Sequence, residues 1–217
     1  ANRDVGVRAA LAWAAGLLAA GIATAFDVSA IAGWIVIVYA LLNVAYSAGL
    51  KHVAILDVFL IASGFMLRLA AGTLGVGIAP SRWLLGCGLM LTLFLGFAKR
   101  HAELAGLEAA DAGGRDVPQR RALADYSPAL LDPLIRICAA GAAIGYALYT
   151  LDASTIATHG TAQLIWTLPF VLYGLFRYLF ALYARGAGAD PARDLLRDPH
   201  LMAALLGWLG LSLWLIH

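Results

Sequence analysis

The sequence predicts an all-α protein, a single polytopic bundle over residues 1–217 with about seven membrane-spanning helices. Hydrophobic residues make up 62% of the chain and charged residues only 13%, about half of their usual share in soluble domains. The apolar residues fall in long runs, so the predicted helices are apolar on every face. The formal net charge of +2 gives no indication of a nucleic-acid partner.

Seven apolar runs approach the roughly 20 residues that a helix needs to cross the hydrocarbon core. Cys87 and Cys138 lie inside two of these runs, which indicates small core residues rather than a disulfide framework. The predicted spans are Arg8–Phe26, Ser29–Gly49, Val53–Gly72, Arg82–Ala98, Ala129–Leu151, Thr161–Tyr183 and Leu201–His217.

Basic residues concentrate in every second connection. The positive-inside rule places these connections in the cytoplasm, with the N-terminus inside and the C-terminus outside. The longest of them, Lys99–Pro128, exceeds an ordinary connection, and we expect a functional or disordered loop there. The basic residues in question are Arg3, Lys51, Lys99, Arg100, Arg115, Arg120, Arg121, Arg185, Arg193 and Arg197.

Polar side chains gather where the second and third spans meet. Asn43 and Tyr46 are three residues apart, so they share one helix face. Asp57 falls about one turn inside the third span, where a carboxylate needs a cation, either Lys51 or a metal. These four side chains predict a binding site. The alternative is a snorkelling Lys51 whose pairing with Asp57 serves packing alone.

A second group of candidates follows the fourth span. Lys99 and Arg100 are suited to phosphate oxygens, and Glu103 could orient Lys99 or position a metal. Arg121 and Tyr126 precede the fifth span and could reach a polar head group at the membrane surface. The alternatives are an ordinary basic anchor and a capped surface helix, respectively.

Other ionisable residues favour structural roles. Asp190, Asp194 and Asp198 are spaced like an aspartate-rich metal motif, but two of them precede proline and indicate helix caps. Ser127 before Pro128 indicates another cap. Arg68 lies deep in the third span, near the opposite membrane face, and is predicted to be too far from the cytoplasmic residues to share their site.

Four stretches of the chain resemble the UbiA superfamily of intramembrane prenyltransferases, in particular its decaprenyl-phosphate phosphoribosyltransferase branch. In the resemblance, the loop after the fourth span begins Lys99-Arg100-His101-Ala-Glu103, where aromatic prenyltransferases carry a second aspartate-rich motif, and this basic start favours a phosphorylated acceptor. The stretches are Tyr46–Val58 with Gly64–Gly72, Ala98–Leu104, Leu123–Leu131 and Pro169–Tyr178.

The resemblance also implies a departure. Family members have about nine spans and an early Asn-Asp-x-x-Asp-x-x-x-Asp motif that binds Mg²⁺, and this sequence contains no such motif. We therefore expect a fragment that lacks roughly two N-terminal spans and the first metal motif, and that is inactive by itself. Asp4 is not a credible substitute for the motif.

What the resemblance implies is a phosphoribosyl transfer without a protein nucleophile. The expected partners are phosphoribosyl diphosphate, a polyprenyl phosphate and the lipid bilayer, with Mg²⁺ as cofactor, in cell-wall precursor synthesis at the inner membrane of a bacterium. The expected active face is cytoplasmic, and the oligomeric state stays open. Substrate would contact Asn43, Tyr46, Lys51, Lys99, Arg100, Arg121 and Tyr126, while Asp57 and Glu103 position cations or metal.

Two other functions remain open at the level of sequence. One is transfer of an isoprenoid from its diphosphate to an aromatic acceptor by a UbiA-type enzyme. The other is a lipid-binding or transport scaffold without catalysis, which would more often show inverted repeats.

Overall fold

The structure, a computed structural model, describes residues 6–112 and 121–217, with side chains throughout except at 7, 8, 109–112, 121 and 122. All regular structure among these residues is helical, which confirms the predicted fold class. Within the described ranges, seven helices are long and apolar enough to cross a membrane, so the chain is a multi-pass membrane protein. They are α1 (Val7–Val28), α2 (Ala30–Ala48), α3 (Leu56–Thr73), α4 (Arg82–Ala112), α6 (Pro128–Leu151), α8 (Leu168–Arg185) and α10 (Pro199–Ile216).

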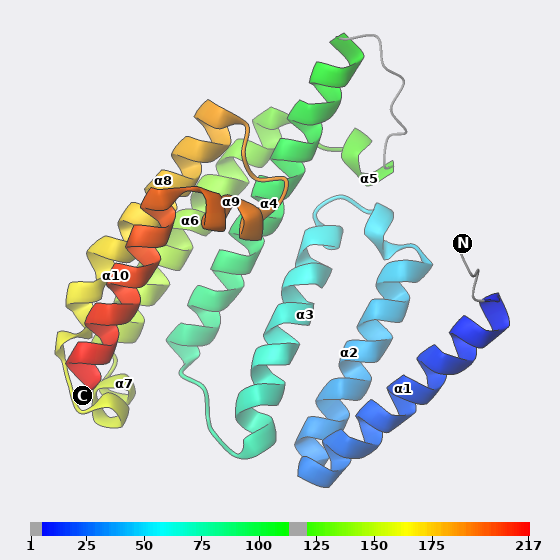
Figure 1. Cartoon of the computed structure of the whole chain (residues 1–217), viewed down its shortest axis with the longest axis horizontal. Helices are drawn as coiled ribbons and strands as arrows, with labels where there is room; N and C mark the ends of the chain where they lie inside the picture. Colours follow the sequence, from blue (N-terminus) through cyan, green and yellow to red (C-terminus); the bar gives the residue numbers. More distant parts are fainter. Residues whose placement is uncertain (1–5, 113–120) are drawn as a thin grey trace.

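Consecutive long helices run up and down, so their connections gather at two opposite ends (Figure 1). The helices α4, α6, α8 and α10 form the more densely packed side, whereas α1 contacts mainly α2. The short helices α5 (Arg121–Ala124) and α9 (Pro191–Arg197) belong to the end with the basic connections, and α7 (Ala153–His159) lies at the other end. This arrangement brings the basic connections together at one end of the bundle.

Helix α4 is longer than predicted. The predicted span ends at Ala98, but the helix continues to Ala112, so the first half of the expected loop Lys99–Pro128 is regular structure. The reason is composition, because this segment is rich in Ala, Glu and Leu, which favour helix even among charges. The middle of that expected loop lies outside the described residues.

Side-chain caps begin several helices as predicted. The Ser127 hydroxyl accepts from the backbone N–H of Leu130 at the start of α6. Asp190 caps α9, and Asp198 accepts from two backbone N–H groups of α10. Asp194 accepts from the N–H of Gly188. The structural interpretation of these three aspartates is confirmed.

Small residues let α4 and α6 approach closely. A Cβ added at Gly145 would lie 3.2 Å from the Cα of Cys87, and one at Gly141 would lie 3.0 Å from the side chain of Met90. Close approach through small residues is a common way to pack helices in membranes, where lipid is as apolar as the side chains. Close packing against α6 thereby fixes the position of α4, whose polar end follows the apolar span.

Candidate functional site

A buried ionic cluster joins α3, α4 and the segment before α6. Asp57, in the first turn of α3, is fully buried. Its Oδ2 accepts a 2.7 Å hydrogen bond from Nε of Arg100, and its Oδ1 accepts one of 2.7 Å from the Tyr126 hydroxyl. Arg100 is only 5% exposed and also donates to Glu103 through Nη1. We call Asp57, Arg100, Glu103 and Tyr126 the Asp57–Arg100 cluster.

Two predicted pairings within this region are wrong. The cation beside Asp57 is Arg100 rather than Lys51, and Glu103 pairs with Arg100 rather than orienting Lys99. Helical spacing would allow Glu103 to meet either residue, since it follows Lys99 by four positions and Arg100 by three. Arg100 is the buried one and is held by Asp57, whereas Lys99 is exposed. Burial favours the arginine, whose planar fork binds two carboxylates at once.

The backbone at Ile55 is held in an unusual conformation beside this cluster. Ile55 has φ of 68°, a left-handed value that is rare for a β-branched residue. Its N–H donates to the Tyr126 hydroxyl at 2.6 Å. Strained backbone of this kind persists where surrounding bonds fix it and is enriched at functional sites. No sequence pattern indicates it, since isoleucine is not expected at such a position.

The Tyr126 hydroxyl joins the segment before α6 to the start of α3 through hydrogen bonds with Ile55 and Asp57. Burial, and secondarily its hydrogen bond to Asp57, raises the pKa of the Tyr126 phenol above its usual range. The phenol is protonated at neutral pH even at its ordinary pKa, and the raised pKa keeps it a donor to the carboxylate at still higher pH. A fixed Tyr126 in turn holds the segment before α6 against the start of α3.

Exposed lysines lie around the buried cluster. Lys51 belongs to the short 3₁₀ turn Leu50–His52, which packs against α5, and both Lys51 and Lys99 are exposed. The side chain of Arg121 lies outside the described ones. The two lysines thus belong to the connection between α2 and α3 and to α4, the elements that flank the cluster, and their side chains are exposed.

Asn43 and Tyr46 line a groove between α2 and α3, together with Arg68. Their shared helix face is confirmed, and the groove has a volume of about 250 Å³. Arg68 lines this groove with Asn43 and Tyr46, which was not expected, but the groove contains no residue of the Asp57–Arg100 cluster, from which Arg68 is separated as predicted. The α2–α3 groove is lined by Tyr39, Leu42, Asn43, Tyr46, Leu60, Ile61, Gly64, Phe65 and Arg68.

A second ion cluster joins α8 to the start of α10. Arg177 donates to Asp198 at 2.8 Å through Nη2, and Arg185 reaches the same carboxylate at 3.3 Å. Hydrogen bonding from Arg177 holds the pKa of Asp198 below its usual range. Because Asp198 also caps α10, these contacts fix the turn between α8 and α10 rather than form a ligand site.

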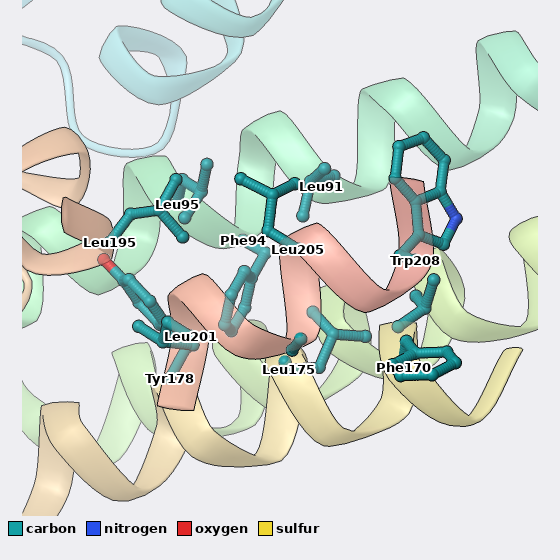
Figure 2. Close-up of a pocket in the computed structure, with 13 residues that line it drawn as sticks. Leu91, Phe94, Leu95, Phe170, Leu175, Tyr178, Leu195, Leu201, Leu205 and Trp208 are labelled. Atoms are coloured by element: carbon teal, nitrogen blue, oxygen red, sulfur yellow. The ribbon is translucent and has the colours of Figure 1, made fainter. Parts of the chain in front are cut away.

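An apolar pocket of about 220 Å³ lies between α4, α8 and α10. Figure 2 shows Tyr178 toward one end of it, beside Leu195 and Leu201, and Trp208 toward the other. The Tyr178 hydroxyl is buried and has no hydrogen-bond partner among the described residues. Leu95, on the wall of this pocket, precedes Arg100 by five residues, about 7.5 Å along the helix.

The described residues do not assemble a magnesium site by themselves. Within this part of the chain, no three His, Cys, Asp or Glu side chains lie close enough together to hold a metal ion. Asp57 uses both oxygens on Arg100 and Tyr126, and Glu103 uses one on Arg100. The expected Mg²⁺ therefore stays a prediction from the resemblance.

Comparison with known proteins identifies relatives along most of the chain. The chain is 33% identical over 172 residues to a decaprenyl-phosphate phosphoribosyltransferase of Corynebacterium glutamicum, covering 79% of the chain and 50% of that protein. It is 29% identical over 208 residues to the protein of that name from Mycolicibacterium smegmatis, covering 90% and 62%. For the one from Mycobacterium tuberculosis, identity is 26% over 176 residues, covering 81% and 55%. Models of known protein families match no part of the chain.

These relatives confirm the predicted resemblance to decaprenyl-phosphate phosphoribosyltransferases. The chain spans about half to three fifths of the length of the curated relatives it matches.

Proposed function

We propose that the protein transfers a 5-phosphoribosyl group from phosphoribosyl diphosphate to a polyprenyl phosphate at the cytoplasmic face of a bacterial inner membrane. The observation that carries this proposal is the buried Asp57–Arg100 cluster, which lies with exposed Lys51 and Lys99 at one end of an apolar bundle. The names of the relatives support the same reaction and suggest decaprenyl phosphate as the acceptor. The product would supply lipid-linked sugar for cell-wall polysaccharide.

In this reaction an oxygen of the lipid phosphate attacks the anomeric carbon of the ribose. The bond from that carbon to the diphosphate breaks, and the diphosphate departs with the bonding electron pair. Negative charge grows on the departing group, so fixed cations and N–H donors lower the barrier. The lipid phosphate is itself the nucleophile, and therefore the reaction needs no nucleophilic side chain.

The cluster would contribute orientation. Asp57 and Glu103 take one N–H donor each from Arg100, at Nε and Nη1, and its other donors make no bond within the described chain. Those donors would bind phosphate oxygens in a fixed direction. Tyr126 would keep Asp57, and through it Arg100, in place.

The exposed cations would contribute attraction. Lys51 and Lys99 have mobile ammonium groups suited to a diphosphate. Asn43, Tyr46 and Arg121 would orient the donor or the lipid head group. The polyprenyl tail would lie in the apolar pocket between α4, α8 and α10. Leu95, which lines this pocket, precedes Arg100 by about 7.5 Å along α4.

The direct test incubates the full-length protein with phosphoribosyl diphosphate and radiolabelled polyprenyl phosphate. We expect a lipid-linked ribose phosphate, with a clear loss of turnover in Lys99→Ala and none in Arg136→Ala, whose side chain is 69% exposed on α6. Prenylation of an aromatic acceptor without any lipid-linked ribose phosphate would show the alternative enzyme. Binding of both substrates without turnover, unchanged in Lys99→Ala, would show a scaffold.

A further inference from the structure

An arginine inside a membrane span faces the α2–α3 groove without a carboxylate partner among the described residues. Arg68 donates one hydrogen bond, to the Tyr39 hydroxyl, and its guanidinium lies 5.0 Å from the Tyr39 ring centroid and 5.2 Å from that of Phe65. A guanidinium has five N–H donors, and ionisable groups within spans usually pair or face a cavity. Arg68 therefore has most of its donors available to a ligand in the groove.

The direction of its side chain shows that Arg68 does not act as an anchor at the far membrane surface. Side chains on a helix lean toward its N-terminus, and α3 begins at the end that carries the Asp57–Arg100 cluster. The contact with Phe65, one turn closer to that end, shows that Arg68 follows this rule. It points into the groove and away from the far interface, where a snorkelling arginine would reach.

The groove also connects Arg68 with the cluster. Arg68 follows Asp57 by eleven residues, close to three helical turns, so both project from the same face of α3. Along α2, Tyr39, Asn43 and Tyr46 follow one another at about one-turn spacing and line the same groove. Polar side chains thus extend from Arg68 toward the cluster.

The other lining residues decide which anion fits. Leu42, Leu60, Ile61 and Phe65 are apolar and line the same space as Arg68. A free sugar phosphate would place its hydroxyl groups against these apolar side chains, where they have no hydrogen-bond partner. A lipid phosphate instead presents a charged head joined to an apolar chain, which matches them. The chemistry that matches this groove is a phosphate monoester on an isoprenoid.

We propose that the α2–α3 groove is a second binding site for an isoprenoid phosphate, with its phosphate on Arg68 and Tyr39. Arg68 lies about 16 Å from Asp57 along α3, too far for a phosphate bound there to react at the cluster. The site would hold acceptor before reaction or product after it, a role that rests on the proposed function. Tyr39, Asn43 and Tyr46 would give the head group polar contacts as it moves.

The test counts bound lipid phosphate on the full-length protein in phosphatidylcholine nanodiscs, with farnesyl phosphate as probe and native mass spectrometry as readout. We expect wild type to bind a second molecule that Arg68→Gln binds at least about tenfold more weakly, because a charge-assisted bond is lost. Gly64→Leu should weaken binding of the same second molecule, since a Cβ at residue 64 would lie 3.5 Å from the Tyr39 side chain and the leucine branches would enter the groove. Arg68→Lys should retain part of the affinity.

Arg136→Gln is the matched control, because it removes an exposed arginine outside the groove. Farnesol should not displace the probe. Displacement by ribose 5-phosphate at similar concentration would overturn the lipid assignment in favour of a soluble sugar phosphate. Unchanged probe binding in Arg68→Gln, with or without a lower Tm, would overturn the site and leave Arg68 a structural role.

Phosphoribosyl transfer is measured separately on the same samples. If transfer is absent but the second farnesyl phosphate still depends on Arg68, the proposed function fails and the binding site stands. If transfer proceeds and Arg68→Gln binds the probe like wild type, the site fails and the proposed function stands.

Discussion

Removing the carboxylate of Asp57 is expected to destabilise the protein strongly. In Asp57→Ala the Arg100 guanidinium, only 5% exposed, keeps Glu103 as its one carboxylate partner among the described residues. Breaking a buried ion pair by deleting one partner costs about 3–5 kcal/mol. The Tyr126 hydroxyl also loses its acceptor, which adds about 1 kcal/mol. The sum is a large share of the roughly 5–15 kcal/mol that stabilises a folded domain.

The measurement is the free energy of unfolding in detergent micelles, from SDS titration followed by tryptophan fluorescence. Asp125→Ala is the control, because Asp125 is exposed and lies next to Tyr126, and its loss should change stability by less than about 0.5 kcal/mol. The loss of stability in Asp57→Asn should lie between the losses in Asp57→Ala and Asp125→Ala, since asparagine keeps the shape and one acceptor oxygen but not the charge. A loss below about 1 kcal/mol in Asp57→Ala would refute the argument that Asp57 compensates a desolvated arginine.

Three further outcomes follow from other contacts. Asp198→Asn keeps the cap on α10 but removes the charge. Because the pKa of Asp198 is lowered on folding, the stabilisation by its carboxylate is present above about pH 4 and is lost as the pH falls below that value. The Tm of the variant should therefore change less with pH over that acid range than the Tm of wild type. Gly145→Ala should lower Tm, since its Cβ would press on backbone of α4, whereas Gly86→Ala, with open space around it, should not. For the proposed reaction, KM for phosphoribosyl diphosphate should rise with ionic strength in wild type and less steeply in Lys99→Ala, because the exposed ammonium attracts through screened charge.

The fold could be predicted from the sequence because membrane crossing imposes a strong and simple pattern. All seven spans are found where apolar runs predict them, with ends that differ by a few residues. The main exception is α4, which extends to Ala112 because helix formers continue after the apolar run. Apolar length predicts where a helix leaves the membrane, but not where it ends.

The candidate site was predictable in its members more than in its contacts. Asp57, Arg100, Glu103 and Tyr126 were all identified, because ionisable groups near apolar runs are conspicuous. Their pairing was not, since Asp57 and Arg100 are 43 residues apart and only packing of α3 on α4 decides which cation faces the carboxylate. The left-handed Ile55 left no signal, because it results from tertiary bonds to Tyr126.

The charge balance of the cluster assigns different work to its arginine and to the lysines around it. Two carboxylates and one guanidinium sum to a net negative charge, so the Asp57–Arg100 cluster cannot by itself attract a diphosphate. Attraction has to come from cations without a carboxylate partner among the described residues, and Lys51 and Lys99 are two such exposed cations at this end. Arg100, held on two sides, can instead offer its remaining donors in one direction without the entropy cost of ordering a long side chain. The lysines would then govern how tightly the diphosphate binds, and Arg100 how it is aligned once bound.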